Sequence, residues 1–226
     1  MRACVSRFVD GGSWRGRFGE EMLGVCPVTS GSSGLGRAAT VEDAPALAEC
    51  LASAFFDDPL WGHWSFPGAD NRRRDLLLFM TLMAERSLDV WTYMTADAES
   101  VTVWTPPGAS YGSVKERHMI AAFNDLFGAR APAIHSLFDQ LEEHTPQGYF
   151  YHLEWWATHR DHVGRGLGSA LLRENLRRVD AERLPSYLES TNPANLPRYE
   201  ALGFRPIDEF APPGGPTVTT MWREAC

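Results

Sequence analysis

The chain of 226 residues is 44% hydrophobic and 22% charged, a composition typical of folded globular proteins and not of disordered ones. A length in this range favours one large domain. The formal net charge of −8 argues against a surface that neutralises many phosphates, so we expect neither DNA nor RNA as a general partner.

The N-terminal segment, residues 1–36, shows no sustained helical or strand period and ends in a run rich in glycine and serine. Such a composition favours a flexible extension, so we place the folded domain at residues 37–226. The segment has no apolar core of secretory length, and no later run approaches about 20 apolar residues. We therefore expect a cytoplasmic protein with no membrane partner, while the oligomeric state stays open.

The four cysteines show neither the C-x-x-C spacing nor the partner histidines of a zinc site. We therefore expect no metal ion and no disulfide framework. These residues are Cys4, Cys26, Cys50 and Cys226.

The first part of the domain is predicted to contain helices and a β-hairpin. A short strand at 37–39 leads to Thr40, which forms a capping-box pattern with Asp43 at the start of a helix over 41–55. The sequence Asp57-Asp58-Pro59 ends that helix, because proline disfavours a helical conformation in the residue before it. Periodic and alternating apolar residues predict the next elements: a helix over 71–88, strands over 90–95 and 101–105, and helices over 113–127 and 132–143.

The last third of the chain alternates between strand and helix patterns. This alternation predicts an α/β fold in which helices flank a sheet that contains parallel neighbours. The predicted elements are strands over 148–158, 186–190, 204–208 and 217–222, and helices over 167–181 and 194–202.

A glycine-rich turn, Val163-Gly164-Arg165-Gly166-Leu167-Gly168, joins the first of these strands to the first of these helices. Such a turn can bind an anion, because glycine lets backbone N–H groups approach it and the helix dipole favours negative charge. A Walker-type phosphate loop is nearly excluded, since this turn contains no lysine. Ser169 stands where a dinucleotide fingerprint requires glycine. A turn without a ligand stays an alternative on this motif alone.

Further segments, taken with this turn in their order and spacing, resemble the GCN5-related N-acetyltransferase (GNAT) superfamily. Within it the pattern is most similar to the puromycin N-acetyltransferases and their actinobacterial relatives. The resemblance spans about residues 37–222. It rests on 161–172 and 187–204, and on the earlier segments Arg37-Ala38-Ala39-Thr40 with Asp43, Ala54-Phe55 with Asp58-Pro59, and Val103-Trp104-Thr105-Pro106.

The resemblance implies a fold and a donor site. The fold is a mixed, mostly antiparallel sheet of six to seven strands, flanked by helices, with one splayed parallel pair. Acetyl-CoA, the implied co-substrate, lies in that gap and places its pyrophosphate on the glycine turn. Val163 stands where relatives carry Gln or Arg, which leaves the acyl group less certain than the CoA. The implied donor-binding residues are Trp156, Ala157, Thr158, Val163, Gly164, Arg165, Gly166, Leu167, Gly168, Ser169, Asn192 and Asn195.

Catalysis of acyl transfer to an amine needs an acid and a proton acceptor. Tyr199 stands where the family places the acid that reprotonates the CoA thiolate, and a phenol suits that task. His152 and Glu154 alternate on one face of the preceding strand and are candidate bases, with Glu189 on the next strand a third. A strand amide at Trp156 or Ala157 is the expected oxyanion donor.

The expected function is acetyl transfer from acetyl-CoA to an amine of a small molecule, such as an antibiotic or an aminonucleoside. Two alternatives stay open. One keeps the fold and uses a longer acyl-CoA or an aminoacyl carrier or tRNA, and the other is a non-catalytic protein that binds CoA or a small molecule. The aromatic residues Trp61, Trp64, Trp104 and Trp155 are candidates for the wall of an acceptor pocket.

Overall fold

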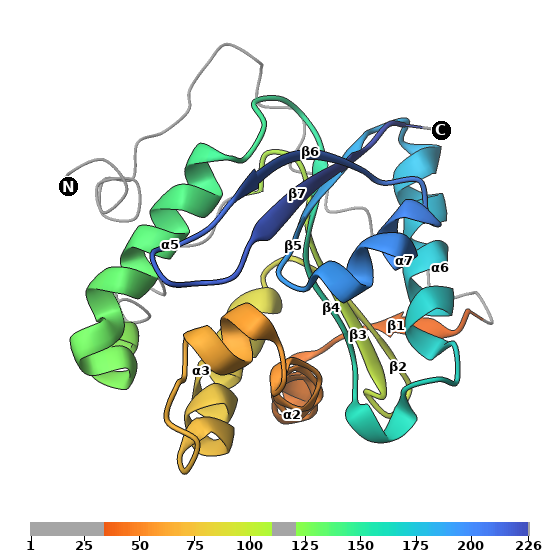
Figure 1. Cartoon of the computed structure of the whole chain (residues 1–226). Coiled ribbons are helices and arrows are strands. Elements are labelled where there is room, and N and C mark those ends of the chain that lie inside the picture. Colours follow the sequence, from red (N-terminus) through yellow and green to blue (C-terminus); the bar gives the residue numbers. More distant parts are fainter. Residues whose placement is uncertain (1–33, 110–120, 226) are drawn as a thin grey trace.

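A computed structural model describes residues 34–109 and 121–225 of the chain. These residues form a seven-stranded sheet in the order β1-β2-β3-β4-β5-β7-β6 (Figure 1). Only β4 and β5 run parallel, and every other neighbouring pair is antiparallel. The predicted mixed sheet with one parallel pair is therefore confirmed. The strands are β1 (Gly36–Ala38), β2 (Trp91–Thr95), β3 (Ser100–Thr105), β4 (Tyr151–Thr158), β5 (Ser186–Ser190), β6 (Arg205–Phe210) and β7 (Val218–Arg223).

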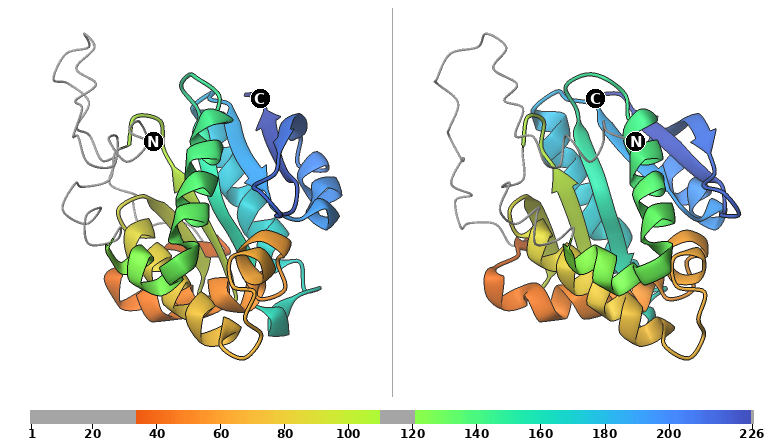
Figure 2. Two further views of the ribbon diagram at one scale, coloured as in Figure 1. Left: turned by 60° about the vertical axis from the view of Figure 1, so that its left-hand side comes forward. Right: turned by 90° about the vertical axis from the view of Figure 1, so that its left-hand side faces the viewer.

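Helices cover both faces of the sheet (Figures 1 and 2). One face carries α2, α3 and α5, and the other carries α6 and α7. The helices are α2 (Ala44–Phe55), α3 (Arg72–Ser87), α5 (Ala131–Glu143), α6 (Leu167–Ala181) and α7 (Leu196–Glu200), with a π-helix η2 (Pro59–Trp64) and short 3-10 turns η1 (Val41–Asp43), η3 (Gly128–Arg130), η4 (Arg160–His162) and η5 (Pro193–Asn195).

The start of the domain agrees with the predicted capping box. Thr40 and Asp43 make both of its hydrogen bonds. The guanidinium of Arg37 donates to both Asp43 oxygens at 2.7 and 2.8 Å, and these bonds hold the pKa of the Asp43 carboxyl well below its usual range, against the opposing effect of burial. Gly36, which the sequence placed in the extension, already pairs with Thr95 in the sheet. The rest of that segment, residues 1–33, lies outside the described residues.

Two differences from the sequence prediction matter for the site. The first is η2, which lies between the helices predicted over 41–55 and 71–88, where the sequence predicted no element. The side chain of Asp58 caps it by accepting from the N–H groups of Leu60 and Trp61, both at 2.9 Å. Gly62 then packs directly on the carbonyl oxygens at the end of α2, where a Cβ would overlap them. A π-helix depends on such packing and is rare, so the sequence pattern did not predict it.

The second difference is a β-bulge in β4. Val103 of β3 pairs with Trp155 and Trp104 pairs with Leu153, so Glu154 is an extra residue on β4. The bulge changes which side chains face which layer. Before it, Leu153 packs toward α6, whereas after it Trp155 packs toward α2 and α3.

The predicted helix over 113–127 is described only from residue 121, where residues 121–127 are helical.

Candidate active site

A cavity of about 480 Å³ opens where β4 and β5 separate. The two strands pair from Tyr151 and Ser186 up to Leu153 and Leu188, and no further. Beyond that point β5 no longer occupies the edge of β4, so the backbone groups on this edge face the cavity. The predicted splay is therefore present, and it begins at the bulge.

The glycine turn lies at one end of this cavity. Gly164 and Gly166 have φ values of +85° and +76°, which favour glycine, and nothing crowds either Cα. Gly168 is required for a different reason, because a Cβ there would overlap the Thr158 hydroxyl and lie 3.0 Å from the Trp156 indole nitrogen. The first turn of α6 is thus held directly against β4, with its free N–H groups at the cavity.

The cavity brings together nearly all the predicted donor-site residues. From β4 come Trp156, Ala157 and Thr158, and from the loop between β5 and α7 come Asn192 and Asn195. The turn contributes Val163, Gly164, Gly166, Leu167, Gly168 and Ser169.

Arg165, a further predicted donor-site residue, does not line the cavity. Its side chain contacts His162 at 2.6 Å and lies 3.9 Å from Glu99, and it is 55% exposed. Arg165 therefore contributes its backbone to an anion site in the turn, and its side chain lies elsewhere. Arg198 of α7 lines the cavity instead, with its guanidinium donating to the Asn195 side chain at 3.3 Å. The sequence analysis did not single out Arg198, although it directly precedes the predicted acid.

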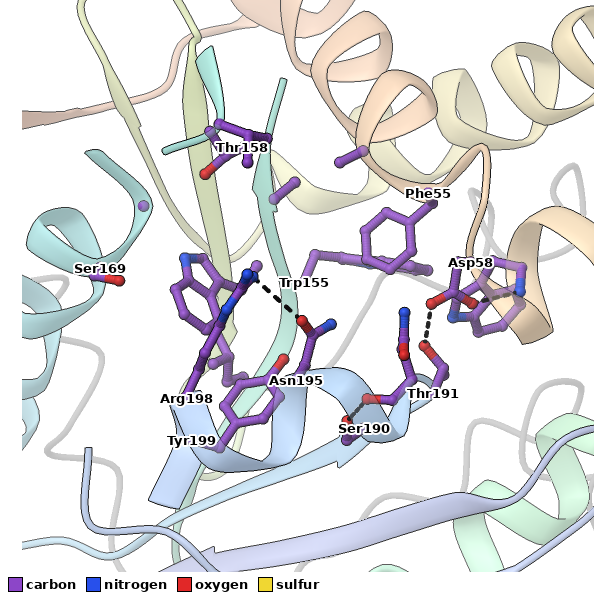
Figure 3. A pocket seen from close by; sticks show the side chains of 18 of the residues that line it. Phe55, Asp58, Trp155, Thr158, Ser169, Ser190, Thr191, Asn195, Arg198 and Tyr199 are labelled. Carbon is purple, nitrogen blue, oxygen red and sulfur yellow. Dashed lines mark hydrogen bonds between the residues drawn. The ribbon is translucent and has the colours of Figure 1, made fainter. Parts of the chain in front are cut away.

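Tyr199 is buried at 8% exposure and its hydroxyl points into the cavity beside Asn195 (Figure 3). Its ring packs edge-on against Trp156 at 5.4 Å and against Phe204 at 6.1 Å. Burial raises the pKa of the phenol, with Asp58 and Glu189 acting in the same direction and Arg198 opposing them. The phenol is therefore protonated throughout the neutral pH range and can act as a proton donor.

His152 and Glu189 form a close pair at the base of the splay. The imidazole Nε2 lies 2.7 Å from Glu189 Oε2, and the Glu189 side chain is only 10% exposed. Glu189 lines the cavity. His152 does not line the cavity and contacts the Glu189 carboxylate. Burial lowers the pKa of His152, but the nearby Glu189 carboxylate, with help from Glu154, outweighs burial and Arg86, so the net shift is upward.

Glu154, the other predicted base, is already engaged by neighbouring side chains. It accepts a hydrogen bond from Arg86 of α3 at 2.9 Å and a very short one from the Thr105 hydroxyl. These bonds fix the bulged residue to two other elements. The carboxylate lines the cavity, but each of its two oxygens is already bound, one by Arg86 and the other by Thr105.

Of the four tryptophans predicted as candidates for the wall of an acceptor pocket, two line the cavity and two do not. Trp61 and Trp155 line the cavity with Phe55; Trp155 contacts Phe55 at 5.3 Å and Trp61 at 5.4 Å. Trp104 is fully buried under α6, and Trp64 borders a separate shallow hollow near Arg130. In Figure 3, Phe55 and Trp155 face Asn195 and Tyr199 from the opposite side.

Asp58 is a buried carboxylate at the cavity, which the sequence placed at a helix stop and in one of the segments of the resemblance but not among the site residues. It is 6% exposed, and besides capping η2 it accepts a hydrogen bond from the Thr191 hydroxyl at 2.8 Å. The signal in the sequence was an aspartate directly before proline, which is the pattern of an N-cap followed by proline at the first helical position.

Within the described residues, no group of three or more His, Cys, Asp or Glu side chains could hold a metal ion. Among the same residues, no helix combines the length and apolar character needed to span a membrane.

Residues 117–204 match the model of the Acetyltransferase (GNAT) family. The fold is shared with a structure from Corynebacterium glutamicum described as histone acetyltransferase HPA2 and related acetyltransferase. The two are 24% identical with a TM-score of 0.64, and the match covers 86% of this chain and 98% of that one.

Two further structures share the fold at 13% identity. Arylalkylamine N-acetyltransferase 2 from Aedes aegypti has a TM-score of 0.52, with 84% of this chain and 98% of that chain covered. The C-terminal condensation domain of Ebony, in complex with beta-alanyl-dopamine, has a TM-score of 0.53, with 84% and 97% covered.

The family model therefore matches less than half of the chain, within residues 117–204, and the solved structures share the fold. At these identities the solved structures establish the fold alone. The particular resemblance to puromycin N-acetyltransferases stays a prediction.

Proposed function

We propose that the chain is an N-acyltransferase that moves an acetyl group from acetyl-CoA to an amine of a small molecule. One observation carries the proposal: a single cavity contains the splayed edge of β4, the glycine turn at the start of α6 and the hydroxyl of Tyr199. A thioester that lay along β4 with its pyrophosphate on the turn would have its sulfur on the Tyr199 side.

The proposed donor site suits a CoA pyrophosphate. The turn offers uncrowded backbone at Gly164 and Gly166 and the first N–H groups of a 15-residue helix, and helix N-termini favour negative charge. Trp156, Ala157 and Thr158 supply strand backbone beside the arm that joins the pyrophosphate to the thioester.

The proposed chemistry is direct attack. The amine nitrogen attacks the thioester carbon, and the negative oxygen that forms is stabilised by a β4 amide at Trp156 or Ala157. The C–S bond then breaks and the thiolate takes the Tyr199 proton. The ammonium form of the amine loses one proton to water before the attack. The second proton that the nitrogen loses passes to the Glu189–His152 pair, which can hold one additional proton on the imidazole and then return it to the Tyr199 phenolate.

The proposed acceptor is a cationic amine. Asp57, Asp58, Glu154 and Glu189 line the cavity, together with the aromatic side chains of Phe55, Trp61 and Trp155. Carboxylates attract an ammonium group, and aromatic faces accept both cations and apolar groups. An antibiotic or an aminonucleoside as acceptor, and a cytoplasmic location, stay predictions.

The test starts with calorimetric titration of the purified chain with acetyl-CoA and with longer acyl-CoAs. Turnover is then followed by release of free CoA thiol with a panel of amines that includes aminonucleosides. We expect acetyl-CoA to bind and at least one amine to be acetylated. Binding without turnover on any amine would favour a CoA-binding protein, and no binding of any acyl-CoA would overturn the proposal.

The role of Tyr199 is tested by Tyr199→Phe, which removes only the hydroxyl. We expect kcat to fall about 100-fold, the low end for loss of a general acid, with unchanged affinity for acetyl-CoA. Tyr149→Phe is the matched control, because Tyr149 is 60% exposed and outside the cavity. Equal kcat values for the two variants would contradict the assignment.

A further inference from the structure

The loop between β5 and α7 lacks the support that a strand ladder gives elsewhere in the sheet. β4 pairs with β5 only up to Leu188, and this loop, residues 191–195, begins three residues later. The loop leads directly into α7, a helix of five residues that carries Tyr199. Because a cavity replaces the strand neighbour on this side, the loop must be held in another way.

Internal hydrogen bonds make the loop stiff but do not attach it across the cavity. The Ser190 hydroxyl donates to the carbonyl of Asn192, and the Asn192 side chain accepts from the N–H of Ala194. The Asn195 N–H donates back to the Asn192 carbonyl. A displacement at the start of this loop would therefore be carried to Tyr199 nearly as a rigid-body movement.

The Asp58–Thr191 hydrogen bond supplies the attachment. The Thr191 hydroxyl donates to Asp58 Oδ2 at 2.8 Å, a contact between residues 133 positions apart in the chain. The other Asp58 oxygen is fixed by two backbone N–H groups of η2, and the residue is 6% exposed. A buried carboxylate held by three donors is a firm anchor.

We propose that Asp58 is a positioning residue for the acid, because its hydrogen bond to Thr191, here called the latch, ties the η2 side of the cavity to the loop that places Tyr199. Figure 3 shows this bond spanning the side of the cavity opposite Ser169. The inference rests on the proposed function insofar as Tyr199 is the acid. Its geometric content, that the latch sets the position of Tyr199, is independent of catalysis.

The charge of Asp58 acts on Tyr199 in addition to the bond. Burial is the largest cause of the raised phenol pKa, Asp58 and Glu189 raise it further, and Arg198 lowers it. The carboxylate itself is buried, which raises its own pKa against the effects of its three hydrogen bonds and of His63. Asp58 can therefore affect Tyr199 in two ways, through its charge and through its hydrogen bond to Thr191, and different substitutions can test each.

The kinetic test is a double-mutant cycle with Thr191→Val and Tyr199→Phe, using the amine that the wild type acetylates best. We expect Thr191→Val to lower kcat about three- to tenfold, the size of one lost hydrogen bond, and Thr191→Ser to restore it. In the Tyr199→Phe background the valine substitution should cost little further, since both changes act through one group. An equal loss in both backgrounds would overturn the proposal.

A second measurement needs no turnover. In protein labelled at tyrosine Cζ, the Tyr199 resonance is assigned by its disappearance in Tyr199→Phe. We expect that resonance to shift or broaden in Thr191→Val, and to titrate at lower pH in Asp58→Asn, which keeps an oxygen to cap η2. The Tyr149 resonance is the internal control.

The kinetic measurement and the resonance measurement together test the latch separately from the proposed function. An unchanged Tyr199 resonance in both variants would overturn the latch whatever the activity. A changed resonance in a protein that acetylates no amine would support the latch and contradict the proposed function. Thermal unfolding of each variant identifies any that has simply lost its fold, and Thr191→Ser then carries the comparison.

Discussion

At the scale of single residues, the proposed proton donor and the proposed proton acceptor differ in their surroundings. Tyr199 lies on α7 in an apolar environment with Trp156 and Phe204. His152 and Glu189 lie on the paired halves of β4 and β5, where each supports the charge of the other. Burial keeps the first group protonated, and the ion pair lets the second take up a proton. Differences in surroundings of this kind separate acid and base roles in many active sites.

The His152–Glu189 pair predicts opposite pH dependences of stability and activity. The pKa of His152 is raised in the folded state, so its stabilisation is fully present below the unfolded value of about 6.5. That stabilisation is lost as the pH rises through the folded pKa. The pair can accept the amine proton only when the imidazole is neutral, so kcat/KM should rise over the same interval.

His152→Asn tests both slopes. Below a pH of about 6.5 we expect the variant to be about 1–2 kcal/mol less stable to urea, for the loss of a charge-assisted hydrogen bond. The wild type should lose this advantage at higher pH, and the variant should show neither the fall in stability nor the rise in kcat/KM. If the pH–rate profile is the same in both proteins, the imidazole takes no part in proton transfer.

At the scale of elements, the proposed donor site depends on how closely α6 approaches β4. Gly168 allows this approach, because the Thr158 hydroxyl and the Trp156 indole lie against its Cα. In an exposed helix the change from glycine to alanine stabilises by about 0.5–1 kcal/mol. Here steric overlap should dominate, since crowding of a packed interface costs about 1–3 kcal/mol.

Gly168→Ala is therefore expected to move the first turn of α6 away from β4 and to weaken acetyl-CoA binding about tenfold or more. Calorimetric titration measures the affinity and thermal unfolding the stability. Gly68→Ala is the matched control, because nothing lies near its Cα. Removal of the Thr158 hydroxyl in the Gly168→Ala background should restore part of the affinity. Unchanged CoA affinity in Gly168→Ala would show that the turn does not hold the donor.

The elements that could be predicted from sequence are those with local signals. The capping box of Thr40 and Asp43, the alternation along β4 and the glycines before α6 depend on neighbouring residues alone. The bulge at Glu154 depends on Arg86 and Thr105, which lie far from it in the chain. The latch joins residues 133 positions apart. Such features arise from tertiary contacts, so a pattern in one segment cannot show them.

At the residue level the sequence predicted which residues belong to the site, but it did not rank the candidate bases. Tyr199 followed from the resemblance, and its burial and direction toward the cavity came from the structure. The candidates His152, Glu154 and Glu189 were equivalent in sequence. Their surroundings distinguish them, because Glu154 is bound to an arginine whereas Glu189 faces the cavity with a histidine behind it.

At the scale of the whole molecule, charge is divided along the cavity. The end at the glycine turn has the N-terminus of α6 and Arg198, and the other part has Asp57, Asp58, Glu154 and Glu189. Asp57 and Asp58 directly follow the C-terminal end of α2, where the helix dipole disfavours negative charge. Asp58 caps η2, which accounts for its position. Asp57 is exposed and lines the cavity.

We therefore expect Asp57→Asn to raise the KM for a cationic amine about two- to fivefold, as for loss of one charge near a binding site. The KM for acetyl-CoA should stay constant or fall, because the donor is an anion. Higher ionic strength should raise the wild-type amine KM toward that of the variant, since salt screens exposed charges. Asp70→Asn, an exposed change outside the cavity, is the control. If uncharged and cationic amines of similar shape lose equally in Asp57→Asn, the division of charge does not select the acceptor, and the aromatic wall of Phe55, Trp61 and Trp155 is left as its main determinant.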